Sequence, residues 1–579
     1  MSRKPEDNRK PDHDPGDRSA VSSYEEWYQR VLSSHKEFAD VRAAAQGMLS
    51  IAEEIDGSAL VGEEKAALKL ACSSLVINAG ADLADVVLLA EGLKLASRAG
   101  SDTTPEQPLH FQCLYNVANA IVTTCDLGLP AQGTWEERAS ELAENRRANR
   151  VELRRARQMF LTVGSSPYAD PRTRSAAYCN LANSLDYSGR WAEAYDFYLH
   201  ALEADPSNGN AAGNLAQLLM NRIQSGVGQT GHIAAVFDKY VKMAQSLRDG
   251  TISFAGADTA NQWDGLEPTE SPGHLSHGLD GVEDEHLKWI AAYRLALSPA
   301  VEGLGTEDPH WDSASIEILY GGSPEEMSPP ILAEMNVLKS DFLVSRQLAY
   351  EGYVQVAEGP EQKDDDSGYY VETLDYSLYG LQYSKLLLAQ RSALDVLDKT
   401  AVVANEHFQV GDEARRVSFR KFWATKDGQV RSELVKAPRY SLPPFALSEL
   451  AYDMEDEGMY APSQALRNAG THRIVHAAFL EATGVTVDAR SRVDLFELID
   501  STMLALQVTR SAYLYLIDLV GSWNHPADHP GTYVPFPSFE YMQLPDDPQQ
   551  HQPTDAHESS KSAGAQPDGH TGSRPRRES

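Results

Sequence analysis

Two short segments of the chain resemble each other and constrain the fold more than any other feature. The first is Tyr115-Asn116-Val117-Ala118-Asn119-Ala120-Ile121, and the second is Cys179-Asn180-Leu181-Ala182-Asn183-Ser184-Leu185. Between about residues 24 and 245, apolar residues recur three and four positions apart, which is the spacing of an amphipathic helix. Similar helices that recur along a chain indicate a repeat architecture, in which each unit buries its apolar face against the next. Residues 21–248 are therefore predicted to form a domain of helical repeats.

The second of these segments extends into a fuller pattern. A first helix would carry Leu181, Ala182 and Leu185, and a second helix would follow the break at 188–190 and end before Asp205-Pro206. Small residues let two helices pack closely, and a proline ends the second one. The pattern resembles a tetratricopeptide repeat of about 34 residues. We expect a solenoid of such repeats that docks a protein partner, and the alternative is an irregular helical bundle.

A cluster of arginines lies inside this region, on what is predicted to be one helix. Its members are Arg146, Arg147, Arg150, Arg154, Arg155 and Arg157. Such a charge run is usually a solvated helix face. The other interpretation is a docking strip for RNA or for an acidic partner.

Composition limits the classes of function. The formal net charge is −33, so the molecule as a whole should repel polyanions, and any contact with nucleic acid must be local. The four cysteines contain no C-x-x-C pair, which argues against a zinc knuckle or a disulfide framework and fits a reducing cytoplasm. The histidines at 274–310 show no metal-ligand spacing. We expect no metal and no cofactor.

Targeting and membrane signals are not expected either. Residues 1–20 lack the apolar core of a signal peptide, and the most apolar stretch, at about 495–520, is interrupted by Asp500 and Arg510. A cytoplasmic location without a membrane span is predicted.

The rest of the chain is divided by its composition. Residues 1–20 and 545–579 have the composition of disordered tails. Residues 249–327 lose helical periodicity and are predicted to be an irregular connector wrapped on the flanking domains. Helical periodicity returns in residues 328–525, and residues 526–544 form a C-terminal extension. In this domain we expect helices at about 332–356, 374–408, 445–457 and 493–520. The predicted fold class is all-α.

A basic stretch from Arg415 to Arg439 reverses the sign of charge locally. The residues that we expect to contact RNA are Arg415, Arg416, Arg420, Lys421, Arg431 and Arg439. Phe419, Phe422 and Trp423 lie between them. Single-stranded RNA is bound by charges that meet its phosphates and by rings that stack on its bases. The other interpretation is a basic loop without a partner.

The segment that most clearly indicates a catalytic site is Arg467-Asn468-Ala469-Gly470-Thr471-His472, which has the form R-[polar]-x3-H. The planar guanidinium of an arginine matches phosphate oxygens, and a histidine can move a proton near neutral pH. Together they suit cleavage of a phosphodiester by a neighbouring hydroxyl. Arg467, Asn468 and His472 are therefore the candidate catalytic residues.

Residues 328–525 resemble the HEPN superfamily, through this motif between two long helices. They resemble most a bacterial branch with upstream helical repeats, through Asn336-Val337-Leu338-Lys339-Ser340-Asp341-Phe342, Ser345-Arg346 and Leu397-Asp398-Lys399. The resemblance implies a helical bundle of four or five helices, dimerisation and metal-independent endoribonuclease activity in toxin–antitoxin or antiviral systems. It assigns Arg467 and His472 to catalysis and Asn468 to support of the motif. The small residues Gly470 and Thr471 make the spacer flexible, which leaves the geometry of the motif less certain than its residue types.

A geometric argument also favours a homodimer. On one regular helix Arg467 and His472 would point about 140° apart, since each residue turns the helix by about 100°. Two such helices related by a two-fold axis would bring both pairs to one cleft. Local unwinding at Gly470 is the competing solution.

Two classes of function are consistent with these features. The first is RNA cleavage by attack of the 2′-hydroxyl, with a repeat domain that senses or docks a partner. The alternative is a non-catalytic dimeric scaffold or nucleotide-binding module. Three further features have two interpretations each: His476 packs in the core or lines the site, Arg510 is a buried ion-pair partner or a phosphate contact, and the acidic run Asp453, Glu455, Asp456 and Glu457 ends a solvated helix or holds a metal.

Overall fold

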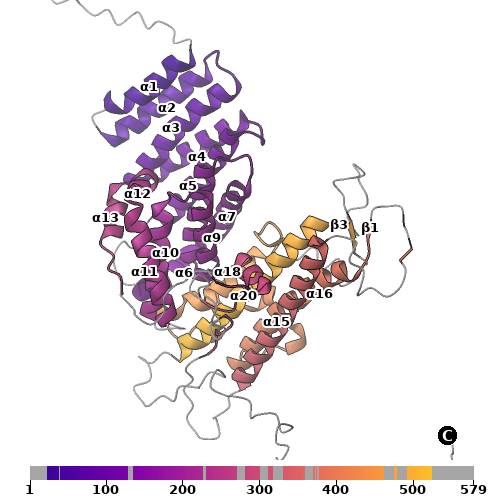
Figure 1. The fold of residues 1–579 in the computed structure, drawn as a ribbon. Coiled ribbons are helices and arrows are strands. Elements are labelled where there is room, and N and C mark those ends of the chain that lie inside the picture. Colours follow the sequence, from indigo (N-terminus) through magenta and orange to yellow (C-terminus); the bar gives the residue numbers. More distant parts are fainter. Residues whose placement is uncertain are drawn as a thin grey trace, which may run out of the picture. The chain divides into compact units, whose positions relative to one another are not determined.

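The structure is a computed structural model of the chain. It describes residues 23–37, 40–127, 129, 135–225, 230–269, 281–299, 311–316, 330–358, 370–371, 373, 377–461, 475–478 and 492–524. All of these residues belong to one compact unit, which spans residues 1–536. The described residues are predominantly helical, and the fold class is all-α (Figure 1).

Helices follow one another through the N-terminal part of the chain. They are α1 (Tyr24–Glu37), α2 (Val41–Asp56), α3 (Gly62–Asp82), α4 (Val86–Ser101), α5 (Pro108–Asp126), α6 (Trp135–Ala148), α7 (Arg150–Ser165), α8 (Pro171–Asp186), α9 (Trp191–Ala204), α10 (Gly209–Ser225) and α11 (Thr230–Ser246). Aspartates start several of the helices, because a carboxylate that accepts from the first free backbone N–H groups stabilises a helix end. Asp85 caps α4 in this way and Asp170 caps α8.

The segment that resembles a repeat is a pair of packed helices. Leu181, Ala182 and Leu185 of α8 are fully buried, and Ala194 and Ala201 of α9 are fully buried as well. A second pair, α10 and α11, comes next along the chain and packs in the same core. The helical character of this region is confirmed, whereas its assignment to the tetratricopeptide class stays a prediction.

The predicted connector contains more helix than the sequence indicated. Three helices of eight residues each, α12 (Arg248–Ala255), α13 (Ala257–Asp264) and α14 (Glu285–Ala292), lie in or at the edge of it. The prediction that the chain is irregular from about residue 249 is therefore wrong for α12 and α13. These helices were missed because a helical period is read over a window of about 11 to 18 residues.

Described residues that come after α14 pack on the C-terminal helices. Asp312 accepts two hydrogen bonds from Arg346, at 2.8 and 2.7 Å, and Trp311 is buried in the main core. Gln507 donates to the backbone carbonyl of Tyr293 at 2.9 Å. The described residues of this part of the chain therefore pack against α15 and α20, whereas its division as a connector stays a prediction.

The C-terminal part is built on three long helices, α15 (Pro330–Ala357), α16 (Leu381–His407) and α20 (Leu495–Trp523). Between α16 and α20 lie α17 (Phe419–Phe422), α18 (Leu442–Asp453) and the 3-10 turns η3 (Ala414–Arg416), η4 (Ser432–Leu434) and η5 (Pro438–Tyr440). The long helices occupy three of the four predicted segments. The fourth segment, predicted at about 445–457, is α18, which begins and ends a few residues earlier.

A small sheet was not expected from the sequence. Its strands are β1 (Ser377–Leu378), β2 (His476–Ala478) and β3 (Arg492–Asp494), in that order. β1 pairs antiparallel with β2, and β2 pairs in parallel with β3, with His476 opposite Arg492. Strands of two or three residues are too short for their period-2 pattern to be read in a sequence.

Helix α20 is the one described helix that is long and apolar enough to cross a membrane. In its most apolar window of 18 residues, however, 89% is buried inside the protein. The side chain of Thr509 donates to the backbone carbonyl of Ala393 in α16, at 2.9 Å. α20 is therefore the central core helix of the C-terminal part, which is consistent with a soluble protein.

Gly189 allows the turn between α8 and α9 to approach the start of α18. Its φ is +76°, and a Cβ atom there would lie 2.9 Å from the backbone oxygen of Leu442. Gly411 has a similar φ, +87°, but no atom within 4 Å of such a Cβ.

We predict that Gly189→Ala destabilises the protein more than Gly411→Ala. Both substitutions carry the cost of a left-handed conformation, roughly 1–2 kcal/mol. Only Gly189→Ala adds a clash with a backbone atom, which a side-chain movement does not relieve. Urea unfolding of the two variants measures the difference, and equal midpoints would contradict the close contact between this turn and α18.

Candidate functional site around the arginine–histidine motif

The predicted catalytic residues Arg467, Asn468 and His472 lie outside the described residues. The described chain ends at Ala461 before the motif and resumes at Val475 after it. The surroundings of the motif are therefore described from the segments that precede and follow it in the chain.

The C-terminal flank of the motif is β2. His476 is half-buried, and its ring meets the ring of Tyr379 edge to face, with centroids 6.3 Å apart. Ala477 and Ala478 are buried, and Ala477 belongs to a small apolar cluster with Leu386 of α16. His476 thus lies on the middle strand of the small sheet and contacts Tyr379. Its two interpretations both stay open, because Arg467 and His472 lie outside the described residues.

The N-terminal flank is held by Tyr460, which is 4% exposed. Its hydroxyl donates to Oε1 of Glu193 in α9, and the hydroxyl of Tyr515 in α20 donates to Oε2 of the same carboxylate at 2.9 Å. Burial and the negative charge of Glu193 raise the pKa of Tyr460 well above its ordinary value. The phenol therefore keeps its proton and remains a hydrogen-bond donor to α9.

Asp453, the last residue of α18, lies between two arginines. Arg157 donates from Nε to Oδ2 at 3.0 Å and from Nη2 to Oδ1 at 2.9 Å, and Nη1 of Arg190 donates to Oδ2. All three side chains are 0% exposed. Burial alone would raise the pKa of Asp453, but the charges of Arg157 and Arg190 outweigh it and lower this pKa below its ordinary value. The aspartate is therefore held ionised inside the protein.

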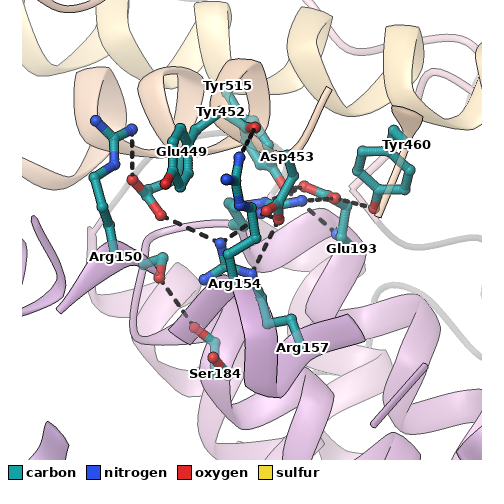
Figure 2. A network of polar contacts seen from close by, with 12 residues as sticks. Arg150, Arg154, Arg157, Ser184, Glu193, Glu449, Tyr452, Asp453, Tyr460 and Tyr515 are labelled. Carbon is teal, nitrogen blue, oxygen red and sulfur yellow. Dashed lines mark hydrogen bonds and ion pairs between the residues drawn. The ribbon is translucent and has the colours of Figure 1, made fainter. Parts of the chain in front are cut away.

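Glu449 lies one turn earlier on α18 and extends the same contacts. Its carboxylate is 3.0 Å from Arg150 and 3.3 Å from Arg157. The ring of Tyr452 lies against the guanidinium groups of both Arg150 and Arg154, each 3.9 Å from the ring centroid (Figure 2). A cation above an aromatic ring is attracted by the π-electrons of the ring. Tyr452 therefore adds a second contact between these two arginines and α18.

We call five of these residues the buried charge network. They are Arg157 and Arg190 from α7 and the start of α9, Glu193 from α9, and Glu449 and Asp453 from α18. The network joins the N-terminal helices to the C-terminal bundle and reaches Tyr460, seven residues before Arg467 (Figure 2).

These contacts correct the interpretation of the arginine cluster. It spans two helices, α6 and α7, which are separated at Asn149. Of its members, Arg150, Arg154 and Arg157 contact α18 and the residues just after it. The cluster is thus neither a wholly solvated face nor free for RNA at these three positions. It is a docking strip whose acidic partner belongs to the same chain.

The remaining arginines of the cluster have local partners. Arg146 is buried and pairs with Asp126 at 2.6 Å, and Arg147 pairs with Glu144 at 2.5 Å. Arg155 is exposed and lies 3.7 Å from Glu152.

The acidic run after α18 also differs from its expected role. Asp456 and Glu457 are exposed, as the end of a solvated helix would be, but Asp453 is bound to two arginines in the core. Within the described ranges, no group of three His, Cys, Asp or Glu side chains is arranged to hold a metal ion.

The basic stretch at 415–439 has exposed basic side chains, but the aromatic rings between them are buried. Phe419, Phe422 and Trp423 are each 1% exposed and belong to the core. The expectation that these rings stack on RNA bases is therefore wrong for the folded chain, because apolar packing has taken them inside.

The basic side chains differ in exposure. Arg415 and Arg416 are 75% and 77% exposed and share Glu413 as a partner, and Lys421 is exposed. Arg439 is exposed and its guanidinium lies 4.8 Å from the centroid of the Tyr440 ring. The other two candidates, Arg420 and Arg431, are half-buried, and Arg431 pairs with Asp412 at 2.7 Å.

Arg510 has the first of its two predicted roles. It is 1% exposed, pairs with Asp196 at 3.1 Å and donates from Nε to the carbonyl of Ala296 at 2.8 Å. It is a buried structural arginine of α20, with its donors directed to α9 and to the segment after α14.

Sequence reasoning missed the buried charge network, although all its residues were visible as charges. Arg157 and Asp453 are separated by 296 residues. One signal existed: an arginine cluster and an acidic run of opposite sign in two domains are complementary, but charge patterns alone do not identify the pairs.

Comparison with known proteins agrees with this architecture. No curated protein matches the chain. Residues 323–522 match the family model described as LA2681-like HEPN. This range contains α15, α16, α18, the motif at 467–472 and all of α20 except its last residue, Trp523. The C-terminal part of the chain therefore contains a domain that is similar to the LA2681-like HEPN domains.

Proposed function

We propose that the protein is a metal-independent endoribonuclease of the HEPN type. The observation that carries the proposal is that the residues matched by the family model include Arg467, Asn468 and His472, whose chemistry suits RNA cleavage. The 2′-hydroxyl of the substrate attacks the adjacent phosphate, and the 5′-oxygen of the next nucleotide leaves.

Each residue of the motif has a role in this reaction. His472 takes the proton of the 2′-hydroxyl or gives one to the leaving oxygen, as a general base or acid. Arg467 stabilises the negative charge that grows on the phosphorane oxygens. Asn468 holds the arginine in place. The products carry a 2′,3′-cyclic phosphate and a 5′-hydroxyl.

The active unit that we propose is a homodimer formed through the HEPN domain. Two motif helices related by a two-fold axis would place two arginines and two histidines around one phosphate. We further propose that the protein acts in the cytoplasm, in a toxin–antitoxin or antiviral system, and that the N-terminal helices dock a protein partner.

The exposed basic residues of the 415–439 stretch are proposed to guide the RNA. The triple substitution Arg415→Ala, Arg416→Ala and Lys421→Ala should weaken binding of single-stranded RNA. It should also reduce the slope of log affinity against log salt by about 2, since each lost phosphate contact on a single strand contributes about 0.7. Filter binding at several salt concentrations measures this slope.

Arg155→Ala is the matched control, because this arginine is 54% exposed but lies on α7. We expect its salt dependence to equal that of the parent protein. An unchanged slope in the triple variant would remove the basic stretch from the RNA path.

The proposed activity is tested by incubating the purified protein with mixed cellular RNA in excess chelator. We expect cleavage by the parent and none by His472→Ala or Arg467→Ala. Cleavage that survives both substitutions would exclude this motif as the active site. If the parent itself leaves the RNA intact, the alternative of a non-catalytic dimeric scaffold is favoured.

A further inference from the structure

A cavity of about 120 Å³ lies between the N-terminal helices and the HEPN domain. Its apolar wall includes Ala139 of α6, Leu218 of α10, and Leu442 and Pro443 at the start of α18. An apolar cavity of about 150 Å³ accommodates a benzene ring. This cavity is somewhat smaller, but it is partly open to solvent, so that a ring-sized group can enter it with part of the molecule outside.

Several polar groups in its wall already have partners. Arg222 of α10 makes two parallel hydrogen bonds to Asp518 of α20, at 2.7 and 2.9 Å. Trp191 donates from Nε1 to the same carboxylate at 2.6 Å, and its ring lies 4.1 Å from the guanidinium of Arg222. The Tyr515 hydroxyl donates to Glu193. Asp518 and Arg222 therefore neutralise each other within the wall.

Asp186, the last residue of α8, is different. Within the described part of the chain its carboxylate has no hydrogen-bond or ion-pair partner. Burial raises the pKa of Asp186 to about 7, although the nearby charge of Arg222 opposes this effect. An unpaired carboxylate in a partly enclosed, largely apolar space is costly, and a cation that binds there reduces the cost.

We propose that the cavity binds a small, flat organic cation, an amidinium or guanidinium on an apolar body, through the carboxylate of Asp186. Such a head group carries two parallel N–H donors that match the two oxygens of a carboxylate. The apolar wall would receive the body of the ligand. An anion is disfavoured, because Arg222 is paired with Asp518 and Asp186 would repel it.

The proposal is independent of RNA cleavage and can be tested without it. Benzamidine is the probe, because it is a flat ring with an amidinium group. Isothermal titration at pH 8 should detect its binding in the millimolar range or tighter. Benzamide has the same shape without the charge, and benzoate has the opposite charge. Both should bind at least about ten times more weakly, since the loss of one charged pair corresponds to about 1.4 kcal/mol.

Two variants locate the probe. Asp186→Asn should weaken benzamidine at least tenfold, whereas Asp456→Asn, at an exposed aspartate, should leave it unchanged. The proposal is overturned if benzamidine fails to bind the parent, if benzoate binds as tightly, or if Asp186→Asn binds benzamidine as the parent does.

A pH prediction checks the state of Asp186 separately. Its pKa is about 7 in the folded protein and 3.8 as an ordinary aspartate, so the folded state holds the proton more tightly. The proton on Asp186 therefore favours the folded state. This contribution to the free energy of unfolding is fully present below pH 4 and is lost as the pH rises to 7. Asp186→Asn should therefore raise the midpoint of thermal unfolding more at pH 8 than at pH 5.

The groups that face Asp186 do not produce this effect. They are Arg222 on α10, Tyr198 on α9 and the neighbouring Tyr187, while Asp518 and Arg439 share the cavity wall. Both tyrosines have a pKa raised above 10, chiefly by burial, and keep their protons between pH 5 and 8. An equal gain in stability at both pH values would contradict the raised pKa.

Discussion

Replacing Asp453 by alanine is expected to lower the free energy of unfolding by about 3–5 kcal/mol, the usual cost of removing one partner from a buried ion pair. The cost is high because Arg157 and Arg190 would both remain in the core, each 0% exposed, without this carboxylate. The loss should appear as a lower midpoint in urea unfolding. We also expect the N-terminal helices to separate from the HEPN domain more easily in this variant, because Asp453 joins α7 and α9 to α18.

The matched control is Asp456→Ala, three residues further along the same acidic run. Asp456 is exposed, and a surface substitution of this kind changes stability by less than about 0.5 kcal/mol. If the two variants unfold at the same urea concentration, the buried charge network does not hold the two parts together.

The second large effect concerns RNA cleavage. His472→Ala should slow cleavage by about 10² to 10⁴-fold, the range that general acid–base catalysis contributes. Arg467→Ala should cost about 10² to 10³-fold, as does removal of one group that stabilises the charge of a transition state. Single-turnover rates on a short RNA separate these losses from losses of binding.

His476→Ala is the control for the histidine, since His476 lies only four residues beyond His472 but packs against Tyr379 in the small sheet. We expect it to retain most of the cleavage rate. A loss as large as that of His472→Ala would mean that His476 lines the site, and the assignment of the two histidines would be reversed.

The sequence predicted the helices well where they are long and periodic. The predicted helix at 332–356 is α15, Pro330–Ala357, and the one at 493–520 is α20, Leu495–Trp523. The predicted helix at 374–408 starts late, at Leu381. It starts there because Gly380, with a φ of +147°, is not helical.

Long-range pairing could not be predicted in the same way. The partners of Arg157 and Glu193 lie in another domain, and the sequence shows only that charges occur in both. The rings at 419–423 show the reverse error: their alternation with basic residues suggested an RNA surface, but apolar burial decided their position. The motif at 467–472 stays a prediction that rests on its residue types and on the family match.

Analysis of the ends of cleaved RNA tests the central claim most directly. A defined RNA is incubated with the full chain in excess chelator, and the products are separated and identified by mass. We predict fragments with 2′,3′-cyclic phosphate and 5′-hydroxyl ends from the parent and intact RNA from His472→Ala. Fragments with a 5′-phosphate and a 3′-hydroxyl, or cleavage by His472→Ala at the parent's rate, would contradict attack by the 2′-hydroxyl at this motif.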